Sequence, residues 1–304
     1  MLILRYAYTI LLNLYGKVYP LDFKMKSIIT IIRCAKTLLF VSLIFSQFYC
    51  KAQTTPLLNG FAHNDYRHKH PLYDALDNGF TNIEADIFLK NNKLIVAHVF
   101  PYFKGKRTLE NLYFKPLSER IARNNGRVYE NYNKPVILMI DIKTGADNTY
   151  DALKPLLQKY SSMLTRLEDG KVVYGAVTVV LSGHKPYDMI GLEQNRFAFI
   201  DEDLRKVSRD TTMSNMFTMA SCKYSKLIRW YGKGTFPEKE RNKLVSFVSM
   251  AHKMGEKVRL WASPDRKAVW DELLKCGVDL INTDRLVTLR KYLSSNSTTL
   301  AKVD

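Results

Sequence analysis

Cysteine is scarce in this sequence, with four residues in 304. Only Cys222 and Cys276 lie beyond residue 52, and they are far apart along the chain. A disulfide-stabilised scaffold needs a denser set of cysteines, so that class is excluded and both residues are predicted to be buried free thiols. With 46% hydrophobic and 25% charged residues, the chain can form one substantial core and is not a disordered polymer.

The sequence also lacks the motifs of nucleic-acid-binding proteins: no zinc-binding pattern, helix-turn-helix signal or aromatic-basic ribonucleoprotein motif is present. Its charge is nevertheless strongly basic, with a net value of +17. Residues 1–52 hold seven of the 46 basic and one of the 29 acidic residues, so the remainder carries 39 and 28 and a net charge of +11. Such a balance favours phosphorylated substrates or anionic lipid surfaces as partners, and a plain solvated basic surface is the alternative.

The apolar run in the N-terminal segment, residues 37–49, is shorter than the roughly 20 residues that a membrane span needs. Within that segment, Met25 opens a stretch typical of a secretory signal, with basic residues, an apolar run over 37–49, and Cys50 and Ala52 before Gln53. We therefore predict a start at Met25, cleavage near Ala52 and export to the periplasm or the exterior. A lipoprotein anchored at Cys50 is the weaker alternative, because bulky residues precede that cysteine.

Beyond residue 52, short apolar runs alternate with helix-like segments, which is the pattern of a parallel sheet with helices outside it. The nine apolar runs are residues 60–64, 82–88, 94–98, 136–142, 177–181, 197–200, 217–220, 258–261 and 278–282. Predicted helices cover residues 71–78, 150–164, 237–253 and 265–276, and Gly79, Gly255 and Gly277 follow three of their ends. We predict an α/β fold, a single-domain (β/α)8 TIM barrel over 53–304, from which 217–220 or 197–200 is excluded as the ninth run.

Polar residues at the carboxyl ends of barrel strands carry catalytic information. Six ionisable residues occupy such positions on the first four predicted strands: His63, Glu84, Asp86, His98, Asp141 and Lys143. Glu84 and Asp86 are two apart on one strand, so their side chains point to the same side, and Asp141 and Lys143 repeat this geometry. These residues are therefore predicted to converge inside the barrel mouth.

Three inward carboxylates need compensation, because unpaired buried charge is costly. A divalent cation, Mg²⁺ or Ca²⁺, held by Glu84, Asp86 and Asp141 would supply it. His63 and His98 would then act as the general acid and base for phosphodiester cleavage, and Lys143 would face the phosphoryl oxygens. The alternative is a structural ion pair at Lys143 with solvated acids around it. Serine hydrolase chemistry at Ser182 is discounted, because no G-x-S-x-G elbow surrounds it.

The sequence resembles the glycerophosphodiester phosphodiesterases and the wider phosphatidylinositol-specific phospholipase C-like superfamily over about 59–293. The motifs that carry the resemblance are Ala62-His63, Ile83-Glu84-Ala85-Asp86-Ile87, Val96-Ala97-His98, Ile140-Asp141-Ile142-Lys143, Val258-Arg259-Leu260-Trp261 and the run from Gly277 to Asp284. The resemblance implies the same barrel, acid-base pair, metal ligands and phosphate-facing lysine. Asn64, Arg67 and Trp261 are predicted to join Lys143 in binding substrate.

Three positions depart from the family pattern. Asn64-Asp65 replaces the usual Arg-Gly after the first histidine, Val99 replaces the Asp after the second, and Asp141 replaces a Glu. These differences resemble an uncharacterised branch, and the D-x-K pattern is similar to that of sphingomyelinase D-like enzymes, so a small-molecule or lipid-headgroup phosphodiester is the expected substrate. No protein or nucleic-acid partner is predicted. Two other hypotheses are a catalytically weak barrel that binds phosphorylated ligands or anionic lipid surfaces, and a two-carboxylate glycosidase.

Overall fold

A computed structural model of the chain describes residues 54–99, 107–207 and 215–300, together with six positions between 28 and 36. The chain separates into two compact units, Met1–Gln53 and Thr54–Asp304. The predicted signal segment lies almost entirely outside the described residues. No helix among the described residues has both the length and the apolar character needed to cross a membrane.

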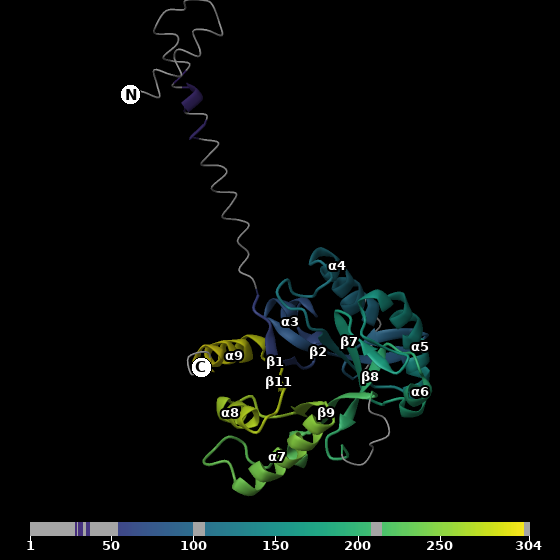
Figure 1. Ribbon diagram of the computed structural model, residues 1–304, viewed down its shortest axis with the longest axis vertical. Helices are drawn as coiled ribbons and strands as arrows, with labels where there is room; N and C mark the ends of the chain where they lie inside the picture. The colour runs from purple at the N-terminus through teal and green to yellow at the C-terminus, as the bar shows by residue number, and fades with distance from the viewer. Residues whose placement is uncertain are drawn as a thin grey trace, which may run out of the picture. The chain divides into compact units, whose positions relative to one another are not determined.

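The second unit is built on eight parallel strands that form a nearly closed barrel (Figure 1). They are β1 (Leu57–Ala62), β2 (Phe80–Lys90), β4 (Val136–Ile142), β7 (Val177–Gly183), β8 (Ala198–Asp203), β9 (Phe217–Lys223), β10 (Lys257–Trp261) and β11 (Ile281–Thr283). Neighbours run in the order β10-β9-β8-β7-β4-β2-β1-β11, and a parallel bridge between Arg259 and Leu280 joins the two ends. The predicted TIM barrel is confirmed.

The run at 94–98 is the one that lies outside the barrel, so the prediction that excluded 217–220 or 197–200 is wrong. Its residues form β3 (Lys93–Val96), which pairs antiparallel with the end of β2 as a hairpin. The turn consists of Asn91 and Asn92, both in the left-handed region with φ of 48° and 57°. Asparagine tolerates this conformation, and two such residues in succession make a tight hairpin turn.

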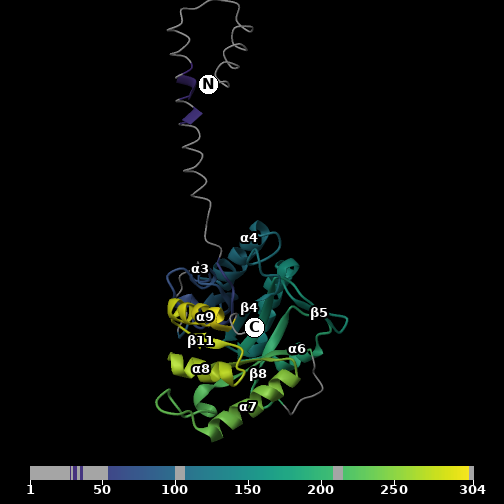
Figure 2. The same ribbon diagram turned by 60° about the vertical axis from the view of Figure 1, so that its left-hand side comes forward.

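Helices surround the strands in both views of the barrel (Figures 1 and 2). They are α3 (Tyr73–Asp77), α4 (Lys115–Arg123), α5 (Ala146–Lys159), α6 (Tyr187–Leu192), α7 (Glu238–Lys253), α8 (Lys267–Lys275) and α9 (Leu286–Leu300), with a two-stranded excursion, β5 (Arg166–Glu168) and β6 (Lys171–Val173), after α5. The four predicted helices are α3, α5, α7 and α8, although α5 begins four residues earlier than expected. Gly79, Gly255 and Gly277 all have positive φ, as helix-ending glycines should.

The core has two parts. Most buried side chains lie in one large cluster that includes outward-facing strand residues and the inner faces of the helices. A second cluster consists of Phe61, Ile137, Met139, Val180, Met219 and Leu280; β4 contributes two of them, and β1, β7, β9 and the position before β11 contribute one each. On β4, Ile137 and Met139 alternate with outward-facing neighbours and precede Asp141, which has the same parity. The apolar layer therefore fills the barrel interior, and the polar residues lie above it at the carboxyl ends of the strands. Cys222 and Cys276 are buried free thiols, as predicted.

Candidate active site

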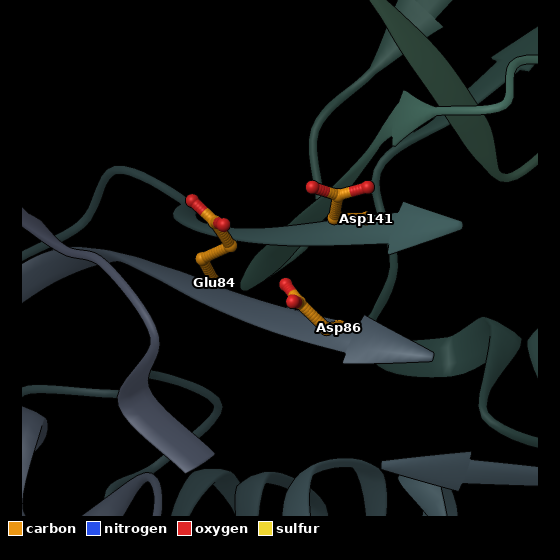
Figure 3. A group of neighbouring side chains, drawn as sticks. All are labelled: Glu84, Asp86 and Asp141. Carbon is orange, nitrogen blue, oxygen red and sulfur yellow. The ribbon is translucent and has the colours of Figure 1, made fainter. Parts of the chain in front are cut away.

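The three predicted carboxylates converge at the mouth of the barrel. Glu84 and Asp86 rise from one face of β2, and Asp141 rises from the adjacent β4 (Figure 3). The parallel register places Asp86 directly opposite Asp141, and Asp141 directly opposite Ser182 of β7. One oxygen from each of the three carboxylates lies within 4.8 Å of the others. This spacing follows from the strand alternation that the sequence already showed.

The carboxylates are only partly neutralised by the protein. The Lys143 ammonium donates to Asp141 Oδ2 at 2.7 Å and lies 3.1 Å from Asp86 Oδ2. The Oδ1 atoms of Asp86 and Asp141 are buried and have no hydrogen-bond partner among the described residues. Burial, followed by repulsion from Glu84, raises the pKa of Asp86 despite the attraction of Lys143. Two orphaned carboxylate oxygens beside a third acid fit a divalent cation with oxygen ligands.

Arg259 is a buried cation that the sequence analysis placed in a motif without giving it a role. It extends from β10 across the barrel, and its Nη1 donates to Glu84 Oε2 at 2.6 Å. Its guanidinium also lies 4.2 Å from the centroid of the Phe61 ring, on top of the interior apolar layer. The signal for this ion pair was a charged residue inside the apolar run 258–261. A buried strand accommodates a charged side chain only when a partner of opposite charge is present.

His63 follows β1 and is held by a carboxylate that the sequence analysis did not single out. Its Nδ1 lies 2.6 Å from Asp284 Oδ1, just after β11, and its Nε2 lies 3.8 Å from Glu84 Oε1. Burial alone would lower the pKa of His63, but the hydrogen bond with Asp284 and the charge of Glu84 outweigh it and raise the pKa. With Nδ1–H donated to Asp284, Nε2 is the ring nitrogen that faces the carboxylates.

His98 reaches the same site from the β2–β3 hairpin, not from a barrel strand. Its Nδ1 lies 3.2 Å from Asp86 Oδ2 and 2.9 Å from the hydroxyl of Tyr66. The buried Tyr66 hydroxyl is also 2.6 Å from Asn64 Oδ1 and 2.8 Å from Asp86 Oδ2. These contacts leave His98 Nε2 without a partner among the described residues. Tyr66 therefore connects the segment after β1 with the hairpin.

The site opens into a cavity of about 470 Å³. It is lined by the six predicted ionisable residues and by Asn64, Ser182, Gly183, Lys185, Asp201, Asp203, Arg205, Ser221, Cys222, Lys223, Lys226, Arg259 and Trp261. Of the residues predicted to bind substrate, Lys143, Asn64 and Trp261 line it. Arg67 does not, because the short helix η1 (Asp65–Arg67) directs it to an exposed position.

Gly183, at the end of β7, lies against the orphaned oxygen of Asp141. A Cβ atom at this position would lie 2.1 Å from Asp141 Oδ1 and 2.4 Å from the carbonyl oxygen of Ile142. The residue also has a backbone φ of +72°, a conformation that residues other than glycine rarely adopt. Only glycine leaves room for the Asp141 carboxylate in this position.

Comparison with known proteins connects this site to named families. The AIM6-like phosphodiesterase domain matches residues 51–201, which include all six predicted ionisable residues. The glycerophosphoryl diester phosphodiesterase family matches residues 257–286, which include Arg259 and Asp284. The two matches therefore cover both sides of the site.

Individual relatives carry the name Altered inheritance of mitochondria protein 6. The protein from Eremothecium gossypii is 31% identical over an alignment of 265 residues that covers 76% of this chain and 68% of the relative. That from Lachancea thermotolerans is 28% identical and is covered over 63% of its length, less than two thirds. A homolog from Arthroderma benhamiae is 26% identical, with 82% of its length covered.

Proposed function

Because this chain belongs to the family of Altered inheritance of mitochondria protein 6, with its AIM6-like phosphodiesterase domain, we propose that it hydrolyses phosphodiesters at the barrel mouth. The observation that carries the proposal is the convergence of three carboxylates, two of them with orphaned buried oxygens, with two histidines in one cavity. Glycerophosphodiesters or phospholipid-type headgroups are the proposed substrates.

We further propose that the activity depends on a divalent cation. Glu84, Asp86 and Asp141 would hold Mg²⁺ or Ca²⁺, which supplies Lewis-acid polarisation of the phosphoryl group when bound. Lys143 pairs with Asp86 and Asp141 and lines the cavity, so one N–H group of its ammonium remains for substrate. It would stabilise negative charge that develops on the non-bridging oxygens.

The two histidines divide the proton transfers. His63 Nε2 would accept the proton of the attacking hydroxyl, either from water or from a neighbouring hydroxyl of the substrate, as the new P–O bond forms. Asp284 fixes the tautomer that this role requires and stabilises the protonated ring. His98 Nε2 would deliver a proton to the departing oxygen as the old P–O bond breaks, and Asp86 and Tyr66 hold its other nitrogen.

A second candidate function is a barrel that binds phosphorylated ligands or anionic lipid surfaces without turnover. The observation that favours it is that protein cations already pair with the carboxylates. Arg259 forms an ion pair with Glu84, and Lys143 forms ion pairs with Asp86 and Asp141. In addition, Val99 stands where an acidic residue is usual, and its side chain is 68% exposed.

The test is hydrolysis of bis(p-nitrophenyl) phosphate and a glycerophosphodiester panel by the purified protein, with Mg²⁺, Ca²⁺ or chelator. We expect turnover that requires metal and is lost in His63→Ala and Asp86→Ala. His252→Ala is the matched control, because His252 on α7 pairs with Asp279 at 2.8 Å and does not line the cavity. A folded protein that turns over no diester would reject the enzyme in favour of the binding barrel.

A further inference from the structure

The cavity is lined by side chains that are acidic on one side of the barrel mouth and mostly basic on the other. Its acidic half is formed by β2 and β4, which contribute the three carboxylates of the proposed metal site. Its other half is formed by the carboxyl ends of β7, β8 and β9 and the residues that follow them, which contribute Lys185, Arg205, Lys223 and Lys226. The proposed chemistry uses only the first half, so the basic half has no assigned task.

The basic half carries an excess of positive charge after its own acids are counted. Asp203 is paired with Arg205, whose Nε donates to Oδ1 at 2.9 Å. Asp201 is the other acid, and Lys185 donates to its backbone carbonyl at 2.7 Å rather than to its carboxylate. Lys223 and Lys226 form no ion pair with any described residue. Four cations therefore face two acids.

Lys223 is also positioned by an aromatic ring. Its ammonium lies 5.7 Å from the ring centroid of Trp261, which lines the same cavity and is 38% exposed. A cation–π contact limits the conformations of an otherwise flexible lysine without neutralising its charge. The lysine is thereby held at the cavity wall and remains available to an anion.

The floor of the basic half has polar groups that are incompletely satisfied. Asp201 is 3% exposed, and its Oδ2 accepts a hydrogen bond from Ser182 Oγ at 3.0 Å. Its Oδ1 is buried and has no partner in the part of the chain that the structure describes. Ser182 and Ser221 are also buried and line the cavity. Buried carboxyl oxygens are normally hydrogen-bonded, so the orphaned Oδ1 indicates a place for a donor from a ligand.

We propose that this basic half is a second subsite for an anionic group of the substrate. The preferred substrate is then a phosphodiester whose alcohol portion carries an additional negative charge, such as a second phosphate, together with a hydroxyl that donates a hydrogen bond to Asp201 Oδ1. The inference rests on the proposed function for the phosphodiester itself, but the anion subsite is a property of Lys185, Lys223 and Lys226 and can be tested without turnover.

The first test measures binding of inorganic phosphate by calorimetry in chelator, where the acidic half repels anions. The variant Lys223→Ala/Lys226→Ala is compared with Lys239→Ala/Lys253→Ala, which removes the same charge from α7, away from the cavity. We expect the first variant to bind phosphate roughly tenfold more weakly than the wild type and the control to match the wild type. Equal affinities in all three proteins, or no phosphate binding, would overturn the subsite.

The second test compares kcat/KM for glycerophosphoglycerol with that for its terminal phosphate ester, at low salt and with metal. We expect a preference for the phosphate ester that Lys223→Ala/Lys226→Ala reduces and the α7 control retains. Running the same pair as intact lipids in phosphatidylcholine vesicles distinguishes a soluble source of the anion from a membrane source. Turnover without any preference rejects the subsite and leaves the phosphodiesterase intact. Phosphate binding that depends on the two lysines, with no turnover, rejects the phosphodiesterase and leaves the subsite.

Discussion

Asp284 shows how much of the site depends on single residues far apart in the sequence. Its carboxylate holds His63 Nδ1 at 2.6 Å, although 221 positions separate the two residues. We predict that Asp284→Asn lowers kcat by about 10² or more, because an amide no longer fixes the tautomer or stabilises the protonated ring. Steady-state kinetics on bis(p-nitrophenyl) phosphate measures this. An unchanged kcat would mean that His63 is not the base.

Gly183 offers a separate prediction at the residue scale. Gly183→Ala introduces a Cβ that collides with Asp141 Oδ1, and it also adds the strain of a positive φ. Gly170→Ala is a matched control, since Gly170 has φ of +74° and nothing within 4 Å of its Cβ position. We expect the control to cost about 1 kcal/mol of folding stability and Gly183→Ala to cost more. Only Gly183→Ala should also weaken metal binding, measured by calorimetry, and equal effects of the two substitutions would disprove the steric argument.

The residues that sequence reasoning found and missed differ in a physical way. Glu84, Asp86 and Asp141 were predictable because strand alternation and the location of barrel sites are local rules. Asp284 and Arg259 were not assigned, because their roles depend on partners across the barrel. Both nevertheless left a signal: Asp284 directly follows the last strand, and Arg259 is a charge inside an apolar run.

At the scale of elements, the main error was the placement of one strand. The run at 94–98 has the length and apolarity of a barrel strand, and these properties alone do not distinguish a parallel strand from a hairpin partner. The Asn91-Asn92 pair was the available signal, because two residues that tolerate positive φ between two apolar runs favour a tight turn. His98 consequently reaches the site from the hairpin, where half of its side chain is exposed.

At the same scale, two buried acids interact: Glu202 lies in β8, and Glu256 lies just before β10. Glu202 and Glu256 are 7% and 4% exposed. Burial, followed by the charge of Glu202, raises the pKa of Glu256 to about 9. The folded state therefore holds a proton that the unfolded chain releases above its ordinary pKa of 4.5. The stabilising contribution is complete below that value and is lost as pH rises towards 9.

The matching prediction concerns Glu256→Gln, which replaces the protonated carboxyl with a neutral isostere. Between pH 5 and 9 the wild type should lose up to about 1 kcal/mol of stability per pH unit through this group, while the variant should not. Thermal unfolding across the pH range measures the difference, with Glu238→Gln at the exposed start of α7 as the control. Parallel pH curves for wild type and Glu256→Gln would show that the pair does not share a proton.

At the scale of the whole molecule, the N-terminal segment is predicted to direct the barrel out of the cytoplasm. We predict that the full chain, expressed in a bacterial host with an intact export pathway, yields a mature protein that begins at Gln53. Ala52→Arg should block this cleavage, because the site requires a small residue. Mass spectrometry of the purified protein distinguishes the outcomes: a lipid-modified Cys50 at the N-terminus would establish the lipoprotein instead, and an uncleaved cytoplasmic product would reject export.

The barrel as a whole should gain stability from the ion that its mouth is proposed to hold. The folded state alone brings Glu84, Asp86 and Asp141 within 4.8 Å of one another, so the proposed cation would bind folded and not unfolded chains. At a free cation concentration of 100 times Kd, binding to the folded state adds about 2.7 kcal/mol to the free energy of unfolding. We expect Mg²⁺ or Ca²⁺ to raise Tm in the wild type and in Asp77→Asn, whose acid is exposed on α3, but not in Asp141→Asn. A rise of the same size in all three proteins would place the ion elsewhere, and no rise in the wild type would mean that Lys143 and Arg259 are the only cations the site accepts.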